Sequence, residues 1–231
     1  MRTSFFALLT ATLFVSFATP EISGLKLAAS QEDEQSAVLG LRQAANQGSA
    51  IAQYELGVMY ATGQGVLQDE KEAVKWYKLA AEQGNPYAQS NLGVMYHNGR
   101  GVLQDYTEAL KWFRLAAEQG DALAQHGLGQ LYKHGRGVMQ DYTEALKWFR
   151  LAAEQGFADA LFNLGIMYLE EKGVSRDIVA AHSWFSLSAF YGLEIGNKVR
   201  DNLAKEMTSS QIATAQDMAR VWLRNFEDKQ N

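Results

Sequence analysis

Small and aromatic residues recur along most of the chain at a spacing of 36 residues, against a variable polar background. The recurring columns include a glycine (Gly48, Gly84, Gly120, Gly156, Gly192), an alanine (Ala52, Ala88, Ala124, Ala160), a tyrosine (Tyr60, Tyr96, Tyr132, Tyr168) and a tryptophan (Trp76, Trp112, Trp148, Trp184). A fixed period of about 20 to 50 residues is typical of solenoids, because each unit is too small to bury its own apolar face. The pattern therefore predicts a stack of similar units.

Each period contains the signals for two helices. The first is expected to follow a capping side chain (Ser49, Asn85, Asp121) and to end at a glycine (Gly63, Gly99, Gly135). Its apolar residues have the helical spacing i, i+4, i+7, i+8. The second is expected to begin at an aspartate three residues before a glutamate, the spacing of a capping box, and to end at the period glycine. These pairs are Asp69 with Glu72, Asp105 with Glu108 and Asp141 with Glu144.

One segment, DYTEALKWFRLAAEQG, occurs without change at residues 105–120 and 141–156. Its acidic residues suit a helix cap, its small and aromatic residues suit packing between helices, and its glycine suits a helix end. We interpret the segment as a structural frame. Functional residues are therefore expected on the first helix of each period, where the copies differ.

The consensus A-x-x-x-L-G-x-x-Y-x-x-G-x-G-V-x-x-D-x-x-x-A-x-x-W-[FY]-x-x-A-A-x-x-G resembles the Sel-one-like repeat (SLR), a relative of the tetratricopeptide repeat. The resemblance implies an all-α fold, a right-handed α/α superhelical solenoid of stacked antiparallel helix pairs. The expected repeats occupy residues 49–84, 85–120, 121–156 and, in a degenerate form, 157–192. One capping helix is expected over 31–48, and C-terminal capping helices are expected over 193–231. In the C-terminal range, Thr208 and Gln211 have the spacing of a capping box.

The N-terminus has the pattern of a secretory signal peptide. A single arginine precedes a fourteen-residue apolar run from Phe5 to Ala18, and small residues follow at 27–30. This run is shorter than the roughly 20 residues that span a bilayer. We expect residues 1–30 to be a signal peptide, the mature chain to lack a membrane span, and the protein to be periplasmic or secreted; an uncleaved anchor is the alternative.

Composition and spacing argue against several kinds of chemistry. The chain has no cysteine, which excludes disulfides and thiolate sites, and its net charge of −5 without a basic block does not favour nucleic acid. None of the four histidines has a His, Asp or Glu three or four residues away, so no helix offers a metal pair, although His97 and His134 could share a ligand across repeats. The glutamates at 82, 118 and 154 follow Lys78, Arg114 and Arg150 at the spacing of solvated ion pairs. We predict no cofactor and no enzymatic activity.

The first helices carry columns that vary between repeats. By analogy with tetratricopeptide solenoids, these helices are expected to line a concave face. A mixture of aromatic, aliphatic, imidazole and amide side chains favours a surface that binds a protein or peptide, and unselected surface drift is the alternative. The candidate binding residues are Tyr54, Val58, Ser90, Val94, His97, His126, Gln130, Lys133, His134, Phe162 and Ile166.

The resemblance implies a function as well as a fold. It implies a non-catalytic scaffold or adaptor for protein–protein contacts in the bacterial cell envelope. Two alternatives stay open. One is an envelope enzyme or a regulator of one, with a β-lactamase-like or peptidoglycan-related role, although such relatives resemble cysteine-rich versions of the repeat. The other is a secreted factor that interacts with a host. The partner and the oligomeric state are not indicated by the sequence.

Overall fold

The computed structural model describes residues 35–230. The predicted signal peptide, residues 1–30, and the start of the predicted capping helix over 31–48 lie outside the described residues. The chain divides into two compact units, with the boundary in the sequence after Gly40. A helix covers residues 35–46.

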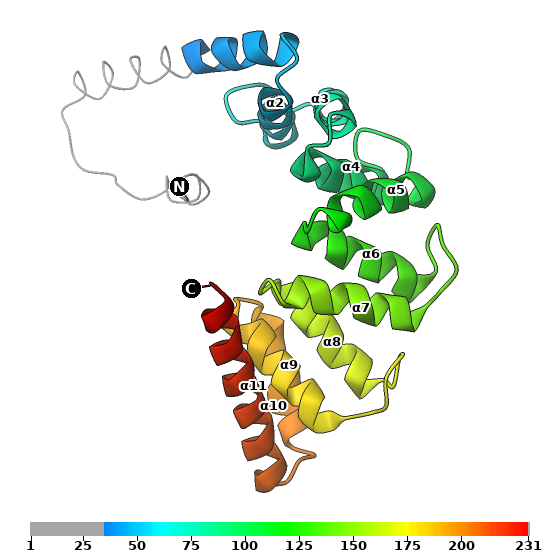
Figure 1. Ribbon diagram of the computed structural model, residues 1–231, viewed down its shortest axis with the longest axis vertical. Helices are drawn as coiled ribbons and strands as arrows, with labels where there is room; N and C mark the ends of the chain where they lie inside the picture. Colours follow the sequence, from blue (N-terminus) through cyan, green and yellow to red (C-terminus); the bar gives the residue numbers. More distant parts are fainter. Residues whose placement is uncertain (1–34, 231) are drawn as a thin grey trace, which may run out of the picture. The chain divides into compact units, whose positions relative to one another are not determined.

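The second unit consists of consecutive helices joined by short turns (Figure 1). They are α2 (Ala50–Thr62), α3 (Glu70–Glu82), α4 (Pro86–Asn98), α5 (Tyr106–Glu118), α6 (Ala122–His134), α7 (Tyr142–Ala153), α8 (Ala158–Leu169), α9 (Ile178–Phe190), α10 (Glu194–Ala204) and α11 (Ser209–Gln230). Residues 35–230 contain no strand. The closest packing is within the pairs α2–α3, α4–α5, α6–α7 and α8–α9, and each pair packs on the next. The predicted all-α solenoid of stacked helix pairs is confirmed.

The first helix of each pair begins as predicted. The side chains of Ser49, Asn85 and Asp121 accept hydrogen bonds from the backbone N–H three residues later, at 3.3, 2.9 and 2.8 Å. Phe157 stands at the equivalent position before α8 and makes no such bond. Each of the glycines Gly63, Gly99 and Gly135 ends its helix with a positive φ, which glycine adopts without steric cost.

The second helices use half of the predicted capping box. The side chain of Asp105 accepts hydrogen bonds from the N–H groups of Thr107 and Glu108. The other half of the box is a hydrogen bond from the aspartate N–H to the glutamate side chain. This part of the prediction is wrong, because the N–H of Asp105 donates instead to the carbonyl of Tyr96 at 3.0 Å. Equivalent backbone bonds occupy Asp69 and Asp141. The box at the start of α11 does close, through Thr208 N–H to Gln211 Oε1 at 2.8 Å and Gln211 N–H to Thr208 Oγ1 at 3.2 Å.

The predicted ion pairs at the ends of the second helices are confirmed for one repeat. Lys78 and Glu82 lie 4.0 Å apart. Arg114 and Arg150 do not pair with the glutamates that follow them. They donate to the hydroxyl groups of Tyr132 and Tyr168 in the next repeat, each at 3.0 Å, so these arginines connect neighbouring repeats.

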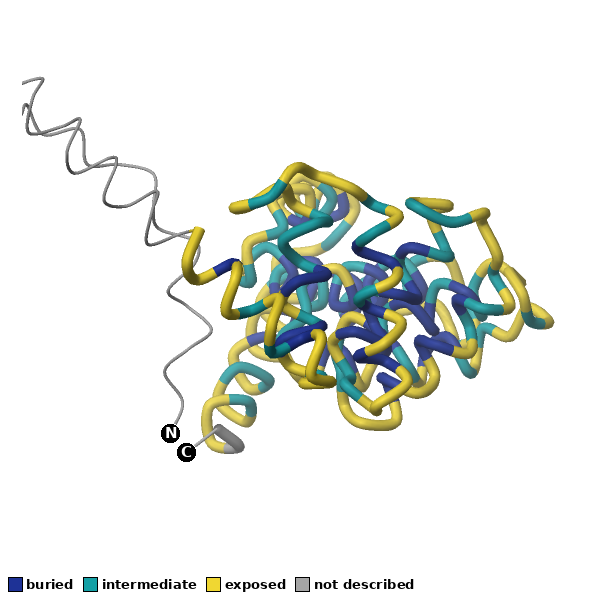
Figure 2. The backbone as a smooth tube through the Cα atoms, turned by 90° about the horizontal axis from the view of Figure 1, so that it is seen from above, coloured by how far each residue is buried: buried dark blue, intermediate teal, exposed yellow. Residues whose placement is uncertain are grey.

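A glycine on each first helix allows the paired helices to approach closely. A Cβ atom added to Gly57 would lie 2.6 Å from the ring of Tyr77, and the same contact recurs between Gly93 and Phe113. The repeats at Gly129 and Gly165 have the same arrangement. Figure 2 shows the buried segments gathered inside the stack and the exposed ones along its turns. We call these rings the floor aromatics, because each packs against the glycine of its paired first helix; they are Tyr77, Phe113, Phe149 and Phe185.

A glutamine pair spans each of the first three repeats and was not anticipated from the sequence. Gln119 Nε2 donates to Gln89 Oε1 at 2.8 Å, and Gln89 Nε2 donates to the carbonyl of Ala81 at 3.0 Å. Gln83 with Gln53, and Gln155 with Gln125, repeat the first bond at 2.7 and 2.9 Å. In the fourth repeat the two positions hold Leu161 and Tyr191, which join one apolar cluster. Both glutamines of the pair are thus replaced together in the fourth repeat.

Helices α10 and α11 pack against α9 at the C-terminal end of the unit. Trp222 of α11 stacks on Phe226 at 5.2 Å between ring centroids and meets Trp184 edge-on at 6.3 Å. These aromatic contacts cover the last helix pair. Within the described residues, no helix combines the length and apolar character needed to cross a bilayer.

Candidate functional site

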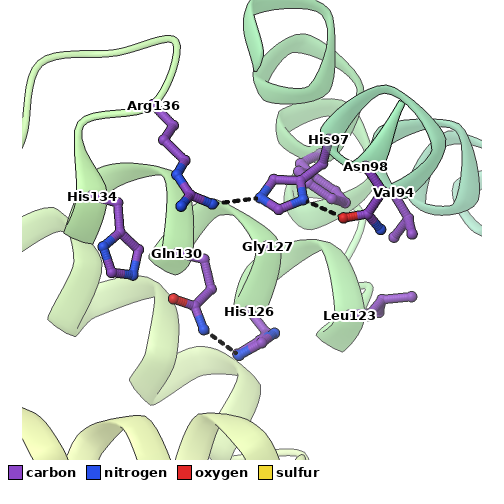
Figure 3. Close-up of a pocket in the computed structure, with 10 residues that line it drawn as sticks. Val94, His97, Asn98, Leu123, His126, Gly127, Gln130, His134 and Arg136 are labelled. Carbon is purple, nitrogen blue, oxygen red and sulfur yellow. Dashed lines mark hydrogen bonds between the residues drawn. The ribbon is translucent and has the colours of Figure 1, made fainter. Parts of the chain in front are cut away.

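A cavity of about 420 Å³ lies between the second and third repeats (Figure 3). Helix α4 contributes Val94, His97 and Asn98; α5 contributes Phe113; α6 contributes Leu123, His126, Gly127, Gln130 and His134; and the turn after α6 contributes Arg136. Five of the candidate binding residues are thereby brought together: Val94, His97, His126, Gln130 and His134. The cavity is the place where the variable columns of two repeats face one another.

One variable column has a small residue in the second repeat. In the first, third and fourth repeats this column holds Tyr54, His126 and Phe162, and each ring packs on the floor aromatic of its own repeat at 6.1, 5.7 and 5.3 Å between centroids. The second repeat has Ser90, whose side chain is too short to cover Phe113 in this way. Ser90, which we predicted as a contact residue, is only 1% exposed and does not line the cavity.

A second small residue, Gly127 of α6, also lines the cavity. Gly127 stands where the other repeats have Glu55, Asn91 and Asn163. A Cβ atom on Gly127 would lie 2.8 Å from the ring of Phe113, and an asparagine side chain would extend further into the same space. The sequence prediction omitted Phe113, which belongs to the repeated frame, and Gly127, whose column was not considered. A glycine in a column of polar residues was the available signal.

His126 forms one side of the cavity and is held by a hydrogen-bond network. Its Nε2 accepts from Gln130 Nε2 at 3.3 Å and from Asn163 Nδ2 at 3.2 Å, and Asn163 Oδ1 accepts from Lys133 Nζ at 3.1 Å. Burial lowers the pKa of His126 to about 4, so the imidazole is neutral at pH 7. Burial also lowers the pKa of Lys133, which points to Asn163 and does not line the cavity.

The rim of the cavity carries cationic and imidazole groups. An Arg136 Nη1 donates to His97 Nε2 at 3.5 Å, and His97 Nδ1 donates to Asn98 Oδ1 at 2.8 Å (Figure 3). The pKa of His134 is lowered by burial and then by the charges of neighbouring cations, including Lys133 and Arg136. Among the described residues, no aspartate or glutamate lines the cavity. The lining therefore carries one permanent positive charge, that of Arg136, and no carboxylate.

Four further candidate binding residues, Tyr54, Val58, Phe162 and Ile166, lie away from the cavity and are half-buried. Tyr54 packs between Tyr77 and Tyr87 at 6.1 and 5.8 Å between ring centroids. Val58 packs against the core of the first two repeats. Phe162 and Ile166 pack against the cluster around Phe185. The structure thus distributes the predicted surface over three repeat junctions, of which the second contains the cavity described here.

The described residues offer no metal centre. They contain no group of three His, Asp or Glu side chains arranged to hold an ion. The proposed sharing of a ligand by His97 and His134 therefore lacks a third protein ligand. Both histidines lie beside Arg136, whose positive charge disfavours a cation at this position.

A second cavity, of about 490 Å³, lies between α9 and α11. His182 lines it and is only 3% exposed, and its Nδ1 has no hydrogen-bond partner among the described residues. The equivalent positions in the first three repeats hold Val74, Leu110 and Leu146. Burial lowers the pKa of His182. The cavity combines this imidazole with apolar side chains of α11 such as Ile212 and Leu223.

The sequence profile of the Sel1 repeat matches residues 50–85, 86–121, 122–157 and 158–189. The chain belongs to the Sel1 repeat family. Sel1 repeats typically form scaffolds for protein interactions and are generally not catalytic. Among curated proteins no sequence match was found.

Two solved Sel1 repeat structures share both sequence and fold with this Sel1 repeat chain. A protective antigen present in uropathogenic Escherichia coli strains is 34% identical, with a TM-score of 0.78 over 84% of this chain and 42% of its own. A Sel1 repeat protein from Oxalobacter formigenes is 39% identical, with a TM-score of 0.63 over 74% of this chain and 49% of its own. The chain thus spans less than half the length of either protein.

Proposed function

We propose that this Sel1 repeat protein is a non-catalytic scaffold or adaptor that binds a protein or peptide through the cavity between α4 and α6. One observation carries the proposal. The frame is nearly constant from repeat to repeat, yet two variable positions, Ser90 and Gly127, are small at the same junction, where Phe113 lines the cavity. Concave sites that combine apolar floors with a few polar groups are typical of ligand binding.

The proposal places the protein outside the cytoplasm, in the periplasm or beyond it. The apolar run from Phe5 to Ala18 supports export, since its length and flanks are those of a signal peptide. The similar protein of uropathogenic Escherichia coli is described as a protective antigen, which is consistent with exposure to a host. Cell fractionation of the native organism, with the protein followed by immunoblot, tests this part. Recovery in the cytoplasmic fraction would contradict it.

Site-specific photo-crosslinking tests the binding surface. A photoreactive amino acid replaces Gln130, inside the cavity, or Leu67, which is 90% exposed in the turn before α3. We expect a discrete crosslinked protein from position 130 and not from position 67. A further change, Ser90→Phe, places the residue of the fourth repeat over Phe113 and should reduce that crosslink at least fivefold. Equal crosslinking from positions 130 and 67 would refute the cavity as the binding surface. So would a crosslink from position 130 that is undiminished by Ser90→Phe.

A further inference from the structure

Three turns carry a cation at the same position of the repeat, and two of these cations have a carboxylate partner. Arg100 pairs with Glu70, with its Nε 2.7 Å from Oε1. Lys172 pairs with Glu170, with Nζ 2.8 Å from Oε2. Arg136 has no carboxylate partner among the described residues. It contacts His97 Nε2 at 3.5 Å and lies over the Tyr106 ring, with Cζ 5.4 Å from the centroid.

The sequence explains why Arg136 is unpaired. The position of Glu70 is occupied by Tyr106 one repeat later, and the position of Glu170 is occupied by His134 one repeat earlier. Both acidic partners that the neighbouring turns use are therefore replaced around Arg136 by uncharged or weakly basic side chains. The unpaired guanidinium is also the one that lines the cavity.

We infer that the cavity binds an acidic peptide segment, in which a carboxylate side chain pairs with Arg136 and an adjacent apolar side chain enters the space over Phe113. The inference rests on the proposed function and adds the chemistry of the partner. A guanidinium forms two parallel hydrogen bonds with a carboxylate, which provides both attraction and orientation. His97 and His134 lie on the same rim, and Val94, Leu123 and Phe113 provide the apolar surface beneath it.

Selection from a random twelve-residue peptide library displayed on phage tests the inference against the full chain. Displayed peptides joined to the phage at their C-terminal ends offer carboxylates only as side chains. We expect enriched peptides to contain Asp or Glu next to a large apolar residue. A synthetic, C-terminally amidated form of the best peptide should bind at least tenfold more weakly when its acidic residue becomes the amide.

Variants of the protein separate the charge contact from general binding. Arg136→Gln should weaken the same peptide at least tenfold, and combining it with the amide peptide should cause little further loss, since both changes remove one contact. Arg100→Gln is the matched control, because it alters the equivalent turn of the preceding repeat and leaves the cavity unchanged; binding should stay within twofold. Circular dichroism checks that both variants remain folded.

The outcomes distinguish the two proposals. Enriched peptides without an acidic residue, or acidic peptides unaffected by Arg136→Gln, would overturn the inference; if Ser90→Phe still abolished their binding, the proposed function would stand. Failure to enrich any peptide, or peptides that bind equally well to the Ser90→Phe variant, would overturn both.

Discussion

Trp112 donates a hydrogen bond from its indole Nε1 to Oε2 of Glu108, 3.0 Å away and one turn earlier in α5. Helix α7 has the same sequence, yet the indole nitrogen of Trp148 is buried without a partner among the described residues. Both glutamates pair with the lysine three residues later, Glu108 with Lys111 at 3.5 Å and Glu144 with Lys147 at 3.4 Å. The two identical segments therefore differ in the bond of the indole and not in this ion pair.

The two tryptophans make a matched pair for substitution by phenylalanine. Trp112→Phe removes an indole and the bond to Glu108, whereas Trp148→Phe removes a donor that has no partner. We expect the first change to lower the free energy of unfolding by about 1 kcal/mol more than the second. Urea denaturation followed by circular dichroism provides the comparison. Equal losses would show that the bond contributes nothing to stability.

The buried glutamine pair predicts a non-additive double mutant. Gln89→Leu removes one of the donors to the carbonyl of Ala81, which still accepts from the N–H of Gly84, and one of the two acceptors of Gln119, and we expect a loss of about 1 kcal/mol. Adding Gln119→Tyr reproduces the apolar pair of the fourth repeat and should recover part of that loss. A thermodynamic cycle measured by chemical denaturation tests the coupling, and strictly additive effects would contradict it.

His126 predicts a pH dependence of stability. Its pKa is about 4 in the folded chain and about 6.5 when unfolded, so the unfolded state binds the proton more readily. The contribution of the neutral imidazole is complete above pH 6.5 and is lost as the pH falls towards 4 and below, up to about 3 kcal/mol. His126→Phe, which copies Phe162, should remove this part of the pH profile. Parallel profiles for both proteins would be evidence against the shift.

Two glycines with positive φ separate backbone strain from steric contact. An alanine at position 120 meets nothing within 4 Å, whereas one at position 137 would place Cβ 2.5 Å from the backbone of Tyr106. Gly120→Ala should cost about 1–2 kcal/mol from the left-handed conformation. Gly137→Ala should cost about 1–3 kcal/mol more, since the preceding repeat must shift. Similar melting temperatures for the two variants would rule out the close contact.

His182 is expected to give a lower free energy of unfolding than a leucine at the same position would. Replacing it with leucine, the residue at 110 and 146, removes a buried nitrogen without a partner and should raise the free energy of unfolding by about 1 kcal/mol or more. The reverse change, Leu146→His, should destabilise the third repeat. A less stable His182→Leu variant would indicate that the imidazole has a role in the second cavity.

Much of the fold followed from the sequence because its signals are local. Helix caps depend on side chains such as Asn85 and Asp121, which bond to backbone three residues away. The capping-box bonds of the second helices were mispredicted since the competing acceptor, the carbonyl of Tyr96, is nine residues earlier and reaches Asp105 only through the turn.

The site was predicted in part for the same reason. Variation between repeats pointed to His97, His126 and Gln130, which do line the cavity. The cavity itself is defined by missing volume at Ser90 and Gly127, residues that face each other only after two repeats stack. Comparing one column at a time does not bring these two positions together, and Arg136 was overlooked because the neighbouring repeats also have a cation at its position, Arg100 and Lys172.

The floor aromatic beneath the cavity has consequences for how such a protein could diversify. Every repeat carries an equivalent ring, at Tyr77, Phe113, Phe149 and Phe185, and a bulky neighbour covers it in the repeats that have one. Under the proposed function, changes at two residues would open or close a binding cavity at a given junction. Duplication of a repeat followed by such changes would move a binding site along the molecule in steps of one unit.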